Sequence, residues 1–131
     1  MKPIPVGAKG SYSFVVDQSH LASTLDASLA QVMSTPSMIA AMEMASLDAI
    51  RPYYDAGESS VGAGITVEHT AATPPSHRVR AEAEVTKVDG RRIELIVRAF
   101  DETGEIGSAT HRRAIVDAAK FNECLKSKMK A

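Results

Sequence analysis

The sequence lacks the features that mark several large classes of protein. A single cysteine, Cys124, among 131 residues excludes an intramolecular disulfide and a multi-cysteine metal site, and it fits a reducing cytoplasm. The 15 Lys and Arg nearly balance the 16 Asp and Glu, so the charge does not favour a general binder of nucleic acid or of membrane surfaces. The first residues contain no apolar h-region, and no run of about 18 apolar residues occurs, so we expect neither a signal peptide nor a membrane span. We therefore expect a soluble cytoplasmic protein without a membrane span.

Apolar periodicity predicts the order of the secondary structure within one domain, residues 1–131. Alternating residues predict a strand over 11–17 and four more strands between 61 and 117. Thr35-Pro36 predicts the start of a long helix, with Thr35 as the N-cap, and Arg51-Pro52 predicts its end. Residues 18–33 are weakly patterned, and we expect a short helix over 25–32 or a flap. A last helix is predicted over 117–130.

The order of these elements predicts the fold class. A long helix followed by a run of antiparallel strands is typical of an α+β domain with the hotdog fold, in which the sheet curls around the helix. Such a sheet leaves one edge and one side of the helix uncovered. A second copy of the chain is the usual cover, so we expect a homodimer or a dimer of dimers.

Glu43 is a carboxylate within the apolar stretch of the long helix. At about 100° per residue, it lies near the centre of one arc of the helix. The other members of that arc are Pro36, Ile39, Ala40, Leu47 and Ile50. We expect this arc to be the buried face of the helix. A carboxylate there must be paired, hydrogen-bonded or used in chemistry.

Three residues carry groups suited to acyl transfer: the hydroxyl of Thr35, the carboxylate of Glu43 and the imidazole of His69. Thr35 and Glu43 are eight residues apart on the predicted helix, which is roughly 12 Å along its axis. They cannot touch, but a substrate could lie between them. Alternation places His69 on the inward face of its strand, and that face is predicted to contain Val61, Ala63, Ile65 and Val67.

Each candidate also has a structural alternative. Thr35 would serve as a helix cap alone, and His69 as a hydrogen-bonded histidine of the core. Glu43 would form an ion pair with Arg98 or Arg113. The remaining histidines, His20, His77 and His111, have no metal-ligand spacing, so no metal site is predicted; His111, next to two arginines, is expected at an edge or interface.

Several strings of residues make the sequence similar to a known family. They are 64–75 (GITVEHTAATPP), 88–92 (VDGRR), 101–102 (DE), 105–111 (EIGSATH) and 120–122 (KFN). With the spacing from helix to histidine, these strings resemble the fluoroacetyl-CoA thioesterase family of hotdog enzymes. The resemblance covers roughly residues 34–122.

The resemblance implies a function and a site. In that family a Thr, a Glu and a His hydrolyse a thioester at a dimer-interface pocket, and these fall on Thr35, Glu43 and His69. Gly62 matches a glycine near the thioester carbonyl, and Arg113 matches an arginine at the pocket. The expected substrate is a short acyl-CoA, so no separate cofactor is needed. A non-catalytic acyl-CoA binding module and a hotdog hydratase or dehydratase are the alternatives.

The sequence departs from the family in the segment before Thr35. The namesake member closes its pocket there with aromatic residues, whereas this segment is shorter and no Phe, Tyr or Trp stands between Phe14 and Tyr53. We expect Leu29 and Met33 to line the pocket, with Gly64 as a further substrate-binding candidate. Without an aromatic lid, we expect little selectivity for a fluorinated acetyl group.

Overall fold

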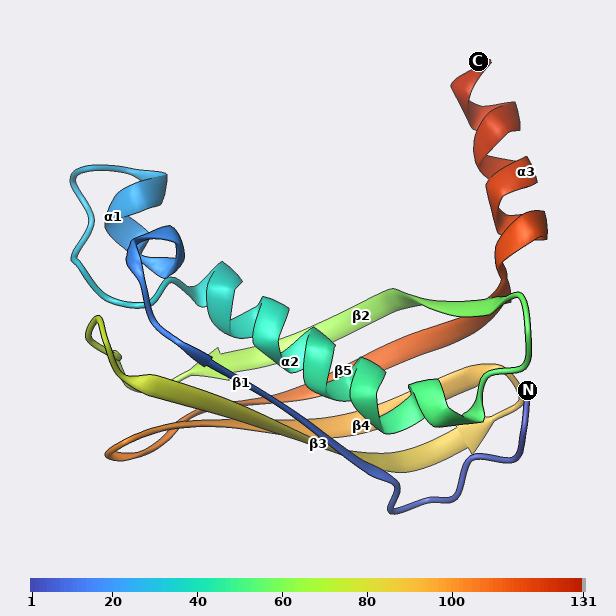
Figure 1. Ribbon diagram of the computed structural model, residues 1–131, viewed down its shortest axis with the longest axis horizontal. Helices are drawn as coiled ribbons and strands as arrows, with labels where there is room; N and C mark the ends of the chain where they lie inside the picture. The colour runs from blue at the N-terminus through green and yellow to red at the C-terminus, as the bar shows by residue number, and fades with distance from the viewer. Residues whose placement is uncertain (131) are drawn as a thin grey trace.

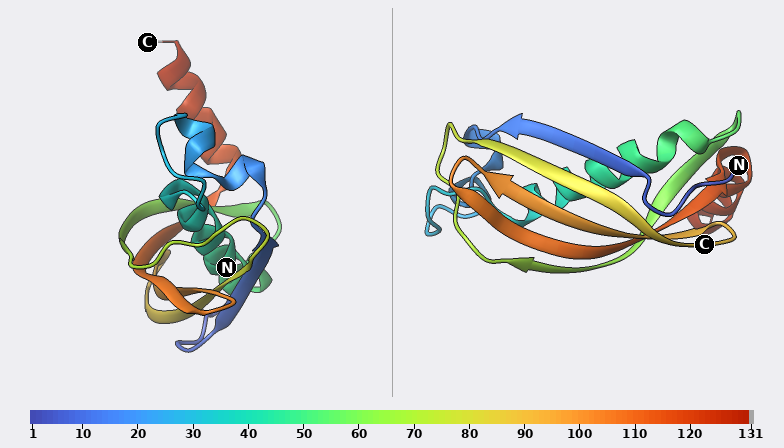
Figure 2. Two further views of the ribbon diagram at one scale, coloured as in Figure 1. Left: turned by 90° about the vertical axis from the view of Figure 1, so that its left-hand side faces the viewer. Right: turned by 90° about the horizontal axis from the view of Figure 1, so that it is seen from below.

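The computed structural model describes residues 1–130 as one curved antiparallel sheet with a long helix in its concavity (Figure 1; Figure 2). In chain order the elements are β1 (Lys9–Val15), η1 (Gln18–His20), α1 (Ala22–Leu25), α2 (Thr35–Ile50), η2 (Arg51–Tyr53), β2 (Glu58–His69), β3 (Arg78–Asp89), β4 (Arg92–Asp101), β5 (Gly104–Asp117) and α3 (Ala118–Met129). The strand order across the sheet is β1-β3-β4-β5-β2, with every neighbouring pair antiparallel. The predicted α+β hotdog arrangement is confirmed.

The ends of α2 follow from local sequence. Ser34 has an extended backbone and its side chain accepts a hydrogen bond from the Ser37 backbone N–H, so it is the N-cap. The prediction of Thr35 as N-cap was wrong by one residue, because Thr35 is already in the first helical turn, next to Pro36. The helix ends at Ile50, as the Arg51-Pro52 pair predicted.

The buried face of α2 is not the predicted arc. The residues that are buried are Met38, Ala41, Met42, Ala45, Ser46, Ala49 and Ile50. Of the predicted arc only Ile50 is among them; Pro36 and Ala40 are exposed, and Glu43 is half-buried. The helix is apolar on most sides, so hydrophobicity does not select a face. The face is selected by side-chain size instead, because the alanines at 41, 45 and 49 let α2 approach β1 closely.

Gly10 on β1 makes this approach possible. A Cβ at Gly10 would overlap the backbone of α2, reaching 2.8 Å from the Ala49 Cα and closer still to two other backbone atoms. We expect Gly10→Ala to lower the free energy of unfolding by roughly 3 kcal/mol, or the melting temperature by about 10 °C, since the backbone must move. Gly62→Ala is the matched control, because a Cβ there meets nothing closer than 3.8 Å. Equal melting temperatures for the two variants in a thermal melt would contradict this packing.

The segment before α2 differs from prediction. Its helix is α1, at Ala22–Leu25, and residues 26–32 form turns and bends, so of the two alternatives the helix over 25–32 is wrong. The turn is stabilised by Asp26, whose carboxylate accepts hydrogen bonds from both the backbone and the hydroxyl of Ser28. Two backbone hydrogen bonds close the segment into a loop: the Ala22 N–H donates to the Val32 carbonyl, and the Ser23 N–H donates to the Ala30 carbonyl.

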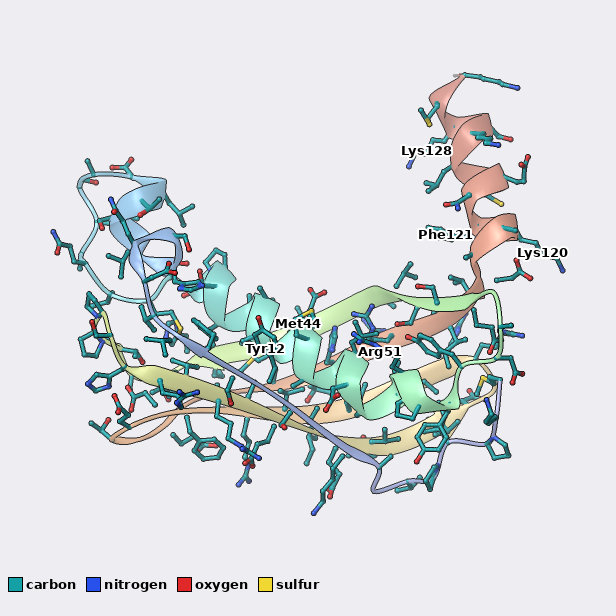
Figure 3. The ribbon with its side chains drawn as sticks, viewed as in Figure 1. Tyr12, Met44, Arg51, Lys120, Phe121 and Lys128 are labelled. Carbon is teal, nitrogen blue, oxygen red and sulfur yellow. The ribbon has the colours of Figure 1, made fainter. Side chains whose placement is uncertain are left out.

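The remaining elements leave parts of the surface uncovered. α2 contacts β1 and β3 far more than β2, and the inward side chains of β2, such as Ile65 and Val67, are only half-buried, so this strand is incompletely covered by the helix. β2 is also an edge strand. α3 begins at its predicted N-cap Asp117 and projects away from the sheet, with Phe121 on it exposed (Figure 1; Figure 3). Within residues 1–130 no helix has the length and hydropathy required to cross a bilayer.

Candidate active site

Thr35 and His69 meet at one end of the molecule. Thr35 opens α2 and His69 closes β2, and the Thr35 Oγ1 lies 2.8 Å from the His69 Nδ1. The other ring nitrogen, Nε2, is buried and has no hydrogen-bond partner among the described residues. A buried polar atom without a partner is costly, so this nitrogen is suited to a partner from a substrate or from a second chain.

A β-bulge in β2 determines which residues face α2. The register with β5 shifts between Gly62 and Gly64, so Ala63 is the extra residue. Ile65, Val67 and His69 pair with the buried positions of β5 and share the inner face, as predicted. The prediction that Val61 and Ala63 share it was wrong, because the bulge reverses the alternation. Gly62 takes the inner position instead.

Glu43 lies in the middle of α2, near Gly62 of β2. Its Oε2 is 3.5 Å from the Arg113 Nη1, and its side chain is 47% exposed while that of Arg113 is 8% exposed. Arg113 is fixed independently of Glu43, donating to the Ser60 hydroxyl at 2.9 Å and to the Ser60 carbonyl at 3.1 Å. Of the two ion-pair partners considered from the sequence, Arg113 is the one in contact; Arg98 pairs with Glu105. The Glu43 carboxylate thus lies beside a fixed cation and is half-exposed, so it is open to a ligand.

His111 is a polar residue of the site that sequence reasoning missed. It is 1% exposed on the inner face of β5, not at an edge as expected, and its Nδ1 lies 2.8 Å from the hydroxyl of Ser46, which is fully buried on α2. Burial lowers the pKa of His111, and the positive charge of Arg113 lowers it further, while Glu43 acts in the opposite direction. The alternation of residues along β5 could have indicated this inward position, because it places His111 on the same face as Ala109 and Arg113.

The other substrate-binding candidates lie in different places. Met33 is 1% exposed and lines a hollow of about 310 Å³ together with Thr35 and His69. Leu29 is 49% exposed and lies outside this hollow. Gly64 is not next to Glu43: the guanidinium of Arg112 lies against it, on the outer face of the sheet.

The structure therefore forms two polar clusters rather than one. The first is the Thr35–His69 pair, and the second contains Glu43, Arg113, His111 and Gly62. Two turns of α2 separate them, and both lie where the inner face of β2 is uncovered. Among residues 1–130, no three His, Cys, Asp or Glu side chains are grouped as a metal site.

A hotdog-type sheet with a polar site along its central helix and edge strand defines the class as a hotdog-fold thioesterase-like domain. The chain belongs to the fluoroacetyl-CoA-specific thioesterase family, whose sequence profile matches residues 16–119. It is 45% identical over 101 residues to the fluoroacetyl-CoA thioesterase of Streptantibioticus cattleyicolor. The aligned region covers 77% of this chain and 73% of that protein.

Solved structures agree with this membership. A structure of the fluoroacetyl-CoA thioesterase FlK superposes with a TM-score of 0.92 at 38% identity, covering 97% of this chain and 98% of that one. A Thermus thermophilus protein of the thioesterase superfamily superposes with a TM-score of 0.91 at 30% identity, covering 99% of this chain and 96% of that one. The resemblance drawn from the sequence strings is confirmed.

Proposed function

We propose that the protein is an acyl-CoA thioesterase that hydrolyses a small acyl-CoA to the free acid and coenzyme A. The observation that carries this proposal is the pairing of Thr35 with His69 at 2.8 Å, with Glu43 on the same helix and open to a ligand. These three residue types are suited to acyl transfer, and the chain's family membership supports the same reaction. The lone exposed Cys124 supports a cytoplasmic location.

The site we propose is shared between two chains. Thr35 and Glu43 are roughly 12 Å apart along the axis of α2, so they do not touch each other within a single chain. In a homodimer built on the uncovered side of α2 and the edge strand β2, Glu43 of one chain would meet the Thr35–His69 pair of the second. Exposed Met44 on α2 (Figure 3) and the half-buried Ile65 and Val67 on β2 supply apolar surface for such an interface. The unpartnered Nε2 of His69 would also gain a neighbour there.

In this arrangement each group has a distinct role. Glu43 either attacks the thioester carbonyl carbon or takes a proton from the attacking water. The carbon–sulfur bond then breaks, and His69 delivers a proton to the departing thiolate. In the route where Glu43 attacks, water then hydrolyses the acyl–Glu43 anhydride, which releases the free acid and restores the carboxylate. Thr35 orients the imidazole through the 2.8 Å contact, Arg113 lies 3.5 Å from the Glu43 carboxylate, and Gly62 leaves room for the substrate beside both.

A thiol-release screen tests the function. Acetyl-, fluoroacetyl-, propionyl- and longer acyl-CoAs are incubated with the protein, and free coenzyme A is measured with a thiol reagent. We expect turnover on several small acyl groups and a decline with chain length. Saturable binding without release of coenzyme A would select the non-catalytic binding module instead. Hydration of an enoyl-CoA with the thioester intact would select a hydratase.

Light scattering tests the shared site at the level of assembly. We expect a species of about 28 kDa or a multiple of it at micromolar concentration, because each site needs two chains of 13.9 kDa. A monomer with full thioesterase activity would contradict the shared-pocket arrangement.

The acyl selectivity should be modest. The hollow beside Thr35 and His69 is lined by Val32, Met33 and Ala71, among others, and contains no aromatic side chain. Discrimination must then come from pocket size, where one methylene is worth about 1–3 kcal/mol. We expect the kcat/KM values for acetyl- and fluoroacetyl-CoA to differ by little more than the ratio of their hydroxide-catalysed rates. A preference thousands-fold beyond that ratio would show that another segment closes the pocket.

A further inference from the structure

His111 and Ser46 form a buried pair that the proposed mechanism leaves without a role. The imidazole is 1% exposed and the serine hydroxyl is fully buried, and they are each other's hydrogen-bond partner at 2.8 Å across α2 and β5. Apolar residues flank the ring in the sheet, since Ile65 of β2 and Leu95 of β4 are its cross-strand neighbours. An aliphatic side chain would pack there without the cost of burying two polar groups.

The second nitrogen of His111 faces a small polar gap. The position that a Cβ would take on Gly62 lies 3.9 Å from the His111 Nε2, 3.8 Å from the Glu43 Oε2 and 3.8 Å from the Arg113 Nη1. Apart from Gly62 and its two chain neighbours, no heavy atom lies closer to that position, and Gly62 is exposed, so water can reach it. One negative group and two nitrogen groups converge on it from α2 and β5.

The surroundings of the imidazole determine its charge. The charged groups that face it are Arg113 on its own strand and Glu43 on α2. Burial and Arg113 together lower the pKa of His111 from its ordinary value, so the ring is neutral at pH 7. If the hydroxyl of Ser46 donates to Nδ1, the single ring proton must be on Nε2, which is the nitrogen that faces the gap.

We propose that Ser46 holds His111 in the form protonated on Nε2, and that this N–H donates to a water bound beside Gly62, between His111, Arg113 and Glu43. A carbonyl oxygen fits the same position less well, because it cannot donate to the carboxylate and would be repelled by it. A water accepts from His111 and Arg113 and donates to Glu43. The water is thus placed where Glu43 can take its proton. The assignment of this water to thioester hydrolysis rests on the proposed function.

Nuclear magnetic resonance of the ¹⁵N-histidine-labelled protein tests the ring state without any activity. We expect a neutral His111 ring protonated on Nε2 at pH 7 in the wild type. Ser46→Ala should give a mixture of tautomers, since Nδ1 loses its donor. A ring protonated on Nδ1, or charged at pH 7, would overturn the proposal even if the protein proves to be a thioesterase. Conversely, an Nε2-protonated ring in a protein that hydrolyses no acyl-CoA would refute the proposed function alone.

Kinetics of matched variants test the role of the N–H. His111→Gln keeps a donor near the Nε2 position, whereas His111→Leu keeps only the packing. We expect kcat to fall roughly 10²-fold in His111→Leu, the usual scale for a lost donor, and less than tenfold in His111→Gln. Gly62→Ala places a methyl group in the gap, so alone it should lower kcat about as much as His111→Leu does. In the double variant, Gly62→Ala should add little to the effect of His111→Leu. Equal kcat in the Gln and Leu variants, with only melting temperatures changed, would show a structural role and overturn the proposal.

Discussion

Replacing Glu43 by glutamine lowers kcat/KM by roughly 10²-fold or more, the scale expected for loss of a catalytic base or nucleophile. Glutamine keeps the shape and hydrogen-bonding reach of the side chain but cannot accept a proton or attack as a carboxylate. Stability should change little, because the Glu43 side chain is 47% exposed and the amide oxygen of glutamine can still accept a hydrogen bond from the buried Arg113 guanidinium. Arg113 also keeps both of its bonds to Ser60. The measurement is a steady-state assay together with a thermal melt.

The chain offers a control for this variant. Glu105 is also 47% exposed and lies 3.6 Å from an arginine, Arg98, which is 66% exposed, and neither residue belongs to the two polar clusters. Glu105→Gln should leave both activity and melting temperature close to wild type. If Glu43→Gln retained activity and instead melted well below Glu105→Gln, Glu43 would be a structural ion-pair partner and no more.

Replacing His69 by alanine should have the second large effect, a fall in kcat of roughly 10²- to 10⁴-fold, which is the range for general acid–base groups. The thiolate of coenzyme A leaves more readily when a proton is delivered to it, and no other described residue near Thr35 supplies one. Thr35→Ala should lower kcat less than His69→Ala, because it removes only the 2.8 Å contact that orients the imidazole ring. Steady-state rates over a pH series measure both effects.

His77 is the control for this histidine. It lies in the loop before β3, beside Glu102 at 3.6 Å, and its Nδ1 is also buried without a hydrogen-bond partner. His77→Ala should therefore carry a comparable structural change without loss of activity. If His69→Ala and His77→Ala lowered kcat equally, the activity loss would reflect a general disturbance of the fold and not a catalytic role for His69.

Much of the fold and half of the site follow from local sequence. The strand alternation, the Asp117 cap and the two X-Pro pairs predicted the order and ends of most elements, because these signals depend on neighbours in the chain. They also placed Thr35 at a helix start and His69 on an inward strand face. The structure brings these two into contact.

The predictions that failed depend on contacts distant in sequence. The buried face of α2 is set by the fit of small alanines against Gly10, and no periodicity shows that fit when both sides of a helix are apolar. The bulge at Ala63 reverses the strand alternation where two glycines carry no side-chain signal. The bond between His111 and Ser46 joins residues 65 apart, so neither residue alone indicated the other.

A purified mixed dimer tests the shared site most directly. The Glu43→Ala and His69→Ala chains are co-expressed with different affinity tags, and the dimer carrying one of each is isolated. If each site takes Glu43 from one chain and His69 from the other, one site of the mixed dimer has both mutations and the other has neither. We then expect about half of the wild-type kcat per dimer, while both parent homodimers are nearly inactive. A mixed dimer as inactive as its parents would show that each site is built within one chain, and it would contradict this account.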